Sequence, residues 1–156
     1  MSRVQLALNV DSLDEAVEFY IKLFATQPAK RRPGYANFAI SDPPLKLVLF
    51  ENPGYGGTIN HLGVEVDTSD EVENHKARIV GEGLAADEEN NTTCCYARQD
   101  KFWVTGPDAQ RWEHYVVLAD SDTFGTSSST VGQSGDVCCA SVQSIDMLEG
   151  IDTVDK

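Results

Sequence analysis

The stretch HLGVEVDTSDE at residues 61–71 repeats QLALNVDSLDE at residues 5–15, with an offset of 56 positions. Each copy opens with an apolar segment typical of a strand. Each then reaches a Ser or Thr, Ser12 or Thr68, that is followed three residues later by Glu, which is the capping box of a helix start. The chain therefore predicts two copies of one unit in which a strand leads directly into a helix.

Further strands are expected after each helix. The helices are predicted to end near Pro28 and at Gly81 or Gly83. Alternating or apolar segments bounded by turn residues then predict strands at 35–40, 45–51, 94–97, 101–105 and 112–118.

This order predicts an α+β fold of two paired βαβββ modules, at about 1–52 and 59–120, forming one curved mixed sheet around a cleft suited to a metal. The intervening segment 52–57 is rich in glycine but lacks a phosphate-binding pattern, so it is expected to be a linker.

Composition separates a domain, residues 1–120, from an acidic tail rich in Ser and Gly, residues 121–156. The tail has six acidic residues and a single basic residue, Lys156. Its last aromatic residue is Phe124. Such a segment buries too little apolar surface to offset its ordering entropy, so a flexible tail is predicted.

The net charge of −13 argues against nucleic acid or an anionic membrane as a partner, because Lys30–Arg32 is a short basic run. No stretch approaches the ~18 apolar residues of a membrane span, and no signal peptide is recognised. We expect a cytoplasmic protein that acts on a small molecule, either as a monomer or as a homodimer.

Three polar residues are candidates for a metal site. The repeat places Gln5 opposite His61 at the start of the two equivalent strands. In the last strand, alternation puts Glu113 and Tyr115 on one face and His114 on the other. An amide oxygen, an imidazole and a carboxylate suit ferrous iron, manganese or nickel, and they leave some of the metal's coordination positions open. Taken singly, Gln5 would be an ordinary polar residue and His61 a structural hydrogen-bond partner. The repeat instead favours a fold in which the side chains of Gln5 and His61 converge.

The adjacent residues Cys94 and Cys95 are either two small buried hydrophobic residues or a ligand pair. In an extended strand their sulfurs would point apart, whereas a bend or mobile loop would bring them to one side. We expect a loop at 86–100, in which Arg98 and Lys101 would lower a thiol pKa. A vicinal dithiol suits trivalent arsenic, cadmium or mercury.

Other polar residues are expected to lie outside the site. His75 is predicted to be solvated on the second helix, and Glu51 to be exposed rather than a ligand. In the tail, Cys138 and Cys139 could supply further thiols or be dispensable.

The paired modules, with Gln5, His61 and Glu113, resemble the vicinal-oxygen-chelate superfamily, which includes glyoxalases, bleomycin resistance proteins and extradiol dioxygenases. The resemblance implies that these three residues bind a divalent metal. Many relatives have histidine where Gln5 stands here. Three ligands rather than four favour oxygen chemistry over isomerisation.

The stretch TTCCYARQDKFWVTGPDAQRWEHYVVLAD, residues 92–120, more closely resembles the bacterial carbon–arsenic lyases and the cadmium-induced proteins. That resemblance implies iron(II)- and dioxygen-dependent conversion of methylarsenite to arsenite, with nickel or cobalt able to replace iron in vitro. Cys94 and Cys95 would bind the arsenic, supported by Tyr96, Lys101 and Tyr115. Two alternatives remain: a non-catalytic protein that binds cadmium or arsenic through thiols, and another dioxygenase or isomerase of the superfamily.

Overall fold

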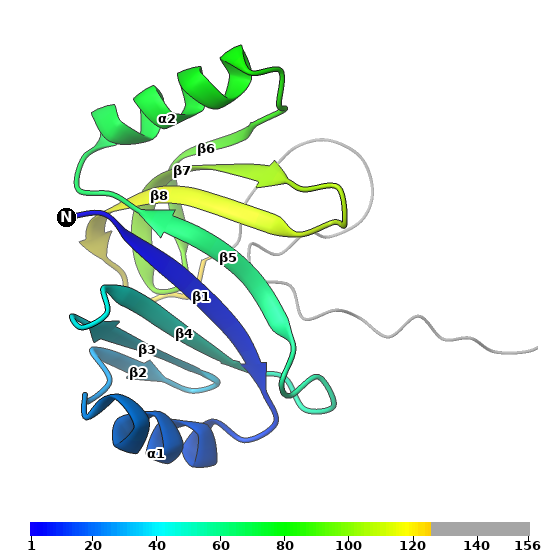
Figure 1. Ribbon diagram of the computed structural model, residues 1–156. Coiled ribbons are helices and arrows are strands. Elements are labelled where there is room, and N and C mark those ends of the chain that lie inside the picture. Colours follow the sequence, from blue (N-terminus) through cyan, green and yellow to red (C-terminus); the bar gives the residue numbers. More distant parts are fainter. Residues whose placement is uncertain (126–156) are drawn as a thin grey trace, which may run out of the picture.

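The computed structural model describes residues 1–125, and neither helix in that range is long and apolar enough to cross a membrane. Two βαβββ modules follow each other as the repeat predicts (Figure 1). In chain order the elements are β1 (Arg3–Val10), α1 (Leu13–Phe24), β2 (Lys30–Arg32), β3 (Tyr35–Ile40), β4 (Leu45–Glu51), β5 (Ile59–Glu65), α2 (Ser69–Gly81), β6 (Asp87–Cys94), β7 (Ala97–Thr105) and β8 (Arg111–Asp120).

All eight strands form one sheet in the order β2-β3-β4-β1-β5-β8-β7-β6. The modules join where β1 runs antiparallel to β5, and each of these strands also has a parallel partner, β4 or β8, from its own module. Figure 1 shows the sheet curled between the two helices, which lie outside it at opposite ends. The predicted curved mixed sheet is confirmed, and both modules come from one chain.

The two helices begin differently despite their similar sequences. At α2, Thr68 and Glu71 form the complete reciprocal capping box. At α1, the Ser12 side chain accepts from the Glu15 N–H, and Oε1 of Glu51 accepts from the Leu13 N–H at 3.0 Å. Glu51 is exposed and satisfies a backbone donor at this helix start, where carboxylates are also favoured electrostatically.

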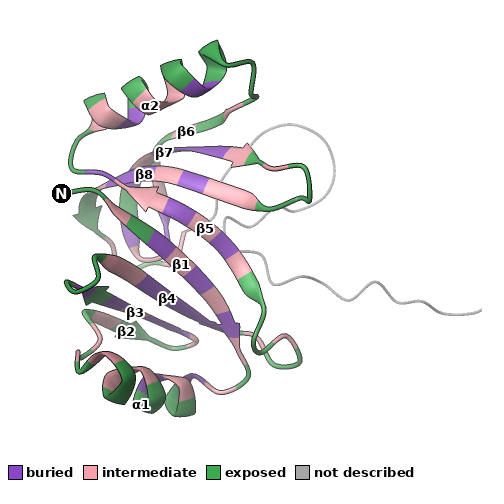
Figure 2. Ribbon diagram, in the orientation of Figure 1, coloured by how far each residue is buried: buried purple, intermediate pink, exposed green. Residues whose placement is uncertain are grey.

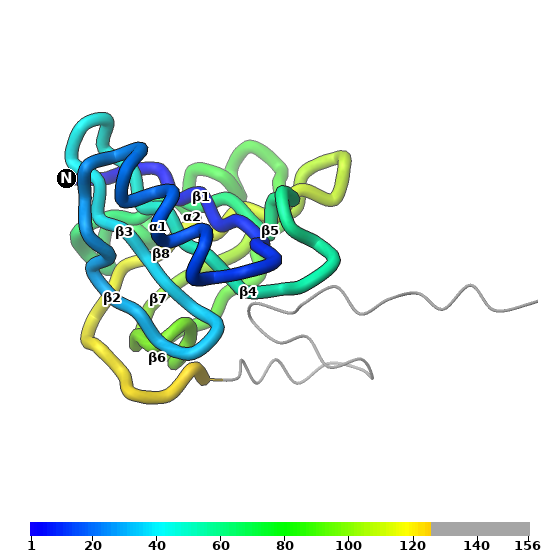
Figure 3. The backbone as a smooth tube through the Cα atoms, turned by 90° about the horizontal axis from the view of Figure 1, so that it is seen from below, coloured from blue at the N-terminus to red at the C-terminus, as the bar shows by residue number. Residues whose placement is uncertain are grey.

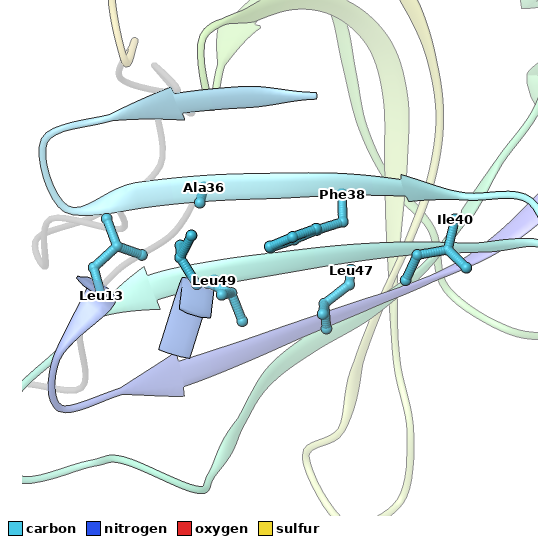
Figure 4. Packing of buried hydrophobic residues seen from close by; sticks show 7 residues of the cluster. Leu13, Ala36, Phe38, Ile40, Leu47 and Leu49 are labelled. Carbon is cyan, nitrogen blue, oxygen red and sulfur yellow. The ribbon is translucent and has the colours of Figure 1, made fainter. Parts of the chain in front are cut away.

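Each helix covers the outer face of the strands in its own module. Alternation along the strands sends one set of side chains under the helix and the other set toward the inner face. Figure 2 shows buried bands alternating with less buried bands along β1 and β5. Figure 4 shows the cluster under α1, and a second cluster lies under α2. The first cluster comprises Leu13, Val17, Ala36, Phe38, Ile40, Leu47 and Leu49.

The region around the cysteines differs from the sequence prediction. Residues 87–94 are strand β6 rather than a loop, and the expected strand at 94–97 is the turn that joins β6 to β7. β6 is an edge strand in which half of the residues are exposed, so its polar composition is compatible with pairing on one side only. The short, basic strand β2 at the opposite edge was not predicted.

Contacts between the two edge regions help to close the curl. Nζ of Lys30 on β2 donates to the Tyr96 carbonyl at 2.8 Å and to Oδ1 of Asp120 at 2.6 Å. Beyond β8 the chain passes beside β2 (Figure 3), and the ring of Phe124 packs against Tyr96 and Phe50. The cysteine turn is thereby held against the first module. Cys138 and Cys139 lie outside the described residues.

Candidate active site

Gln5, His61 and Glu113 meet on the inner face of the sheet, on strands β1, β5 and β8. Nε2 of Gln5 lies 2.9 Å from Nε2 of His61 and 3.1 Å from Oε2 of Glu113. Oε2 of Glu113 lies 3.4 Å from Nε2 of His61. All three residues are 4% exposed. The convergence inferred from the 56-residue offset is thus present.

The surroundings of His61 and Glu113 favour binding of a cation. Nδ1 of His61 lies 2.8 Å from Oδ1 of Asn60, whose amide nitrogen in turn donates to Asn9 at 3.0 Å. When Nδ1 carries the ring proton, as binding of a metal at Nε2 would require, the lone pair of Nε2 faces Gln5 and Glu113. Burial opposes ionisation of Glu113, but Lys101 and His61 together hold the pKa of its carboxyl far below the usual range. The site therefore offers an imidazole and a carboxylate.

The Gln5 amide presents its NH₂ group to those two acceptors. Its Oε1 accepts from the hydroxyl of Tyr115, which also lies 3.3 Å from Oε2 of Glu65. A cation would require the amide to present its oxygen instead, because an NH₂ group is a donor only. A half-turn of the amide exchanges the two atoms, and the Tyr115 hydroxyl can accept from Nε2 as readily as it donates to Oε1. The donor set therefore fits a divalent metal.

Lys101 contacts one carboxylate oxygen of Glu113, while the other oxygen faces Gln5 and His61. Its Nζ lies 3.1 Å from Oε1 of Glu113 and 3.5 Å from Oε2 of Glu89, and the side chain is fully buried. Oε2 remains directed toward His61 and Gln5. Within residues 1–125 no group of three or more His, Cys, Asp or Glu is placed to hold a metal.

The two cysteines lie in a tight turn that brings their sulfurs together. Cys95 and Tyr96, its two central residues, have φ of 53° and 62°. Positive φ at both central positions is the hallmark of a type I′ hairpin turn. The sulfurs of Cys94 and Cys95 lie 3.2 Å apart. The expected bend is present, although it is formed by a hairpin.

The dithiol turn and the metal-binding candidates share one cavity of about 270 Å³. Cys95 lies in its wall, while Cys94 is buried beneath and packs against Trp103. The Trp103 ring in turn contacts the imidazole of His61, with centroids 5.2 Å apart. Lining residues include Gln5, Tyr35, Lys46, Val48, Phe50, His61, Glu65, Cys95, Gln99 and Glu113.

The cations near the thiols are arranged differently from the sequence expectation. Arg98 is exposed on β7, and Lys101 is directed to the two carboxylates. Lys46, which was not predicted, lines the cavity beside Cys95. Burial lowers the pKa of the Lys46 ammonium, and attraction to Glu65, Glu113 and the Cys95 sulfur only partly offsets this. Its position on β4, directly opposite Gln5 on β1, explains its place in the site.

Two histidines lie away from this cavity. As predicted, His114 points to the outer face, where it stacks on Phe102. His75 is half-buried rather than solvated, and its Nδ1 lies 3.4 Å from Nδ1 of His114. Tyr96 packs on Tyr35, and its carbonyl is held by Lys30, so it supports the dithiol turn.

Gly63 on β5 gives Gln5 the room that it occupies. A Cβ atom there would lie 3.1 Å from the Glu113 carbonyl and 3.3 Å from Nε2 of Gln5. We expect Gly63→Ala to displace the Gln5 amide and weaken metal binding on the order of tenfold, as loss of a supporting residue commonly does. Isothermal titration of metal-free protein with ferrous iron under anaerobic conditions measures this. Gly81→Ala, where a Cβ has open space, is the matched control, and equal affinities for both variants would contradict the role of Gly63.

The profile of the Glyoxalase/Bleomycin resistance protein/Dioxygenase superfamily matches residues 3–114. The chain belongs to this superfamily. Superfamily members of solved structure share the fold: the manganese-bound glyoxalase of Novosphingobium aromaticivorans has a TM-score of 0.54 at 16% identity, over 82% of this chain and 44% of that one. An extradiol ring-cleaving dioxygenase from B. fuscum has a TM-score of 0.55 at 15% identity, over 77% and 34%.

Curated relatives within the superfamily are much more similar in sequence. The chain is 61% identical to the cadmium-induced protein CadI of Mycobacterium bovis, over 89% of this chain and 93% of the relative. It is 54% identical to the trivalent organoarsenical cleaving enzyme of Thermomonospora curvata, over 89% of each. The family resemblance expected from the sequence is therefore confirmed.

Proposed function

We propose that this protein cleaves the carbon–arsenic bond of trivalent organoarsenicals, converting methylarsenite to inorganic arsenite with iron(II) as cofactor and dioxygen as co-substrate. The observation that carries the proposal is the shared cavity, in which Cys95 of the dithiol turn faces the same space as Gln5, His61 and Glu113. A relative at 54% identity that is named for cleaving trivalent organoarsenicals supports it.

The dithiol turn supplies the substrate site in this proposal. Methylarsenite carries two hydroxyl groups on arsenic; when the thiols of Cys94 and Cys95 replace them, two water molecules leave. Arsenic then keeps its methyl group and gains two sulfur ligands. Because the turn is fixed by paired strands and by Lys30, the arsenic is held at one place beside the cavity, which favours reaction over diffusion away.

The inner-face residues supply the metal site. Gln5, His61 and Glu113 would hold a ferrous ion, and such an ion supplies activation of dioxygen, which side chains alone cannot provide. Lys101 holds one carboxylate oxygen of Glu113 and keeps the other directed to the centre. Oδ1 of Asn60, 2.8 Å from Nδ1 of His61, would accept a proton held there and so leave Nε2 for the metal.

The proposal predicts arsenite release that needs iron and dioxygen together. Protein reconstituted with ferrous iron under anaerobic conditions is mixed with methylarsenite, exposed to air, and analysed for inorganic arsenite and oxygen consumption. We expect multiple turnovers in the complete mixture and none when either iron or air is omitted.

Other outcomes would favour the alternatives. Stoichiometric arsenic or cadmium binding without product would indicate a thiol-based binding protein, as the vicinal dithiol also suits cadmium. Turnover of another substrate that survives replacement of both cysteines would indicate a different superfamily enzyme. Either outcome contradicts the proposed reaction.

A further inference from the structure

Glu65 lines the same cavity as the metal-binding candidates and lies on the same strand as His61. The register of the sheet places Arg3 of β1 and Tyr115 of β8 on either side of it. Oε2 of Glu65 accepts from Nε of Arg3 at 2.9 Å and lies 3.6 Å from Nζ of Lys46. Burial opposes ionisation, but the hydrogen bond from Arg3 and the charge of Lys46 hold the pKa of the carboxyl below its usual value. The ionised carboxylate can only accept hydrogen bonds.

The hydroxyl of Tyr115 has one proton and two acceptors within reach. It lies 2.5 Å from Oε1 of Gln5 and 3.3 Å from Oε2 of Glu65, and Tyr115 is fully buried. A hydroxyl that donates its proton to one neighbour can only accept from the other. When the proton goes to Gln5, the NH₂ group of that amide faces His61 and Glu113.

Binding of a metal requires these hydrogen bonds to reverse. The Gln5 amide must turn its oxygen to the metal, so its NH₂ group comes to face the Tyr115 hydroxyl. That hydroxyl then accepts from Gln5, and its proton needs a different acceptor. Oε2 of Glu65 is within reach of it. Without this acceptor the buried hydroxyl would keep an unpaired proton, and the free-energy cost of that proton would disfavour the metal-binding orientation of the amide.

We propose that Glu65 is a positioning residue for the metal site. By accepting the Tyr115 proton, its carboxylate makes the hydroxyl an acceptor for the NH₂ group of Gln5 and thereby directs the Gln5 oxygen to the metal. No proton leaves these three side chains, and only the direction of two hydrogen bonds changes. The inference rests on the metal site of the proposed function. Glu65 itself does not bind the metal and acts through Tyr115.

The substitution Gln5→Glu provides a background in which this role of Glu65 is not needed. A carboxylate has two equivalent oxygens, so one can accept from Tyr115 while the other binds the metal. Metal-free protein is titrated calorimetrically with ferrous iron without air, in the parent and Gln5→Glu backgrounds, each with and without Glu65→Leu. We expect the loss of iron affinity caused by Glu65→Leu to be on the order of tenfold larger in the parent background. An effect of charge or of general structure would weaken binding by the same factor in both backgrounds.

The conservative variant Glu65→Gln separates hydrogen-bond acceptance from charge. Arg3 and Lys46 are donors only, so the oxygen of the new amide faces them and stays an acceptor for Tyr115. We therefore expect Glu65→Gln to keep most of the iron affinity that Glu65→Leu loses. Glu18→Leu, at an exposed position of α1, is the control and should leave iron binding unchanged.

Urea denaturation of each metal-free variant verifies that it is folded. If Glu65→Leu unfolds because Lys46 loses its carboxylate partner, the same comparison is made with Glu65→Leu combined with Lys46→Met, which removes both charges. Equal weakening in the two backgrounds, or a Glu65→Gln variant as weak as Glu65→Leu, would overturn the proposal. Unchanged iron affinity in Glu65→Leu would overturn the role of Glu65 and leave the proposed reaction standing, whereas a parent protein that binds no iron would contradict both.

Discussion

A Cys94→Ser, Cys95→Ser variant is expected to lose methylarsenite binding while it keeps its affinity for iron(II). The two sulfurs, 3.2 Å apart, act as one chelate, so the second As–S bond forms at a high effective concentration. Even Cys95→Ser alone should weaken binding by a factor on the order of 10²–10⁴. Anaerobic titration with methylarsenite, followed by arsenic analysis after gel filtration, measures this loss.

The chain provides a matched control for this experiment in its other adjacent cysteine pair. A Cys138→Ser, Cys139→Ser variant removes the same number of thiols from the tail and should bind arsenic as the parent protein does. If the tail variant lost binding and the Cys94, Cys95 variant kept it, the substrate site assigned to the turn would be wrong. Because Cys94 is buried, the iron titration also verifies that the serine variant is folded.

Glu113→Gln is expected to weaken iron binding strongly, because a neutral amide replaces the carboxylate, and also to destabilise the metal-free protein. The substitution removes the negative charge of a proposed metal ligand and leaves the fully buried Lys101 with Glu89, 3.5 Å away, as its remaining carboxylate among the described residues. Removing one partner of a buried ion pair typically costs about 3–5 kcal/mol in the free energy of unfolding. Urea denaturation of metal-free protein and anaerobic iron titration measure the two effects.

A double variant separates the two roles of Glu113. Glu113→Gln combined with Lys101→Met removes both charges, so much of the lost stability should return while iron binding should not. Arsenic binding should persist in the double variant, because the turn and its sulfurs are untouched. Full iron affinity in either Glu113 variant would contradict the assignment of Glu113 as a ligand.

The sequence alone was sufficient for the parts of the site that follow from the repeat. The 56-residue offset pairs Gln5 with His61, and alternation in the last strand orients Glu113, Tyr115 and His114 correctly. These inferences hold because side-chain direction along a strand has a strict period of two.

The arrangement of the cysteines could not be obtained in the same way. Whether adjacent sulfurs diverge or meet depends on the backbone conformation at Cys95 and Tyr96. Both residues have positive φ, which a sequence signals only weakly when the residues are not glycine. The polar segment 87–91 was also misleading, because an edge strand can be polar on both faces.

Gln99, which lines the cavity, was overlooked although a signal was available. Ala97, Gln99, Lys101 and Trp103 alternate along β7 and are all buried. Since Lys101 was already a candidate, the same alternation would have placed Gln99 beside it. Lys46 had no such signal, because its place in the site depends on which strand pairs with β1.

The two modules, which join where β1 pairs with β5, share one pattern of strands and helix but contribute different groups to the cavity. The second module contributes His61, Glu113, Gln99 and both cysteines of the turn, whereas the first contributes Gln5 and the wall of Tyr35, Val48 and Phe50. Substitutions at those three wall positions can change the size of the bound molecule without altering the strands that carry the thiols, the imidazole and the carboxylate. The wall of the first module can thus change in shape while Gln5 and the second module keep the polar groups and sulfurs of the cavity.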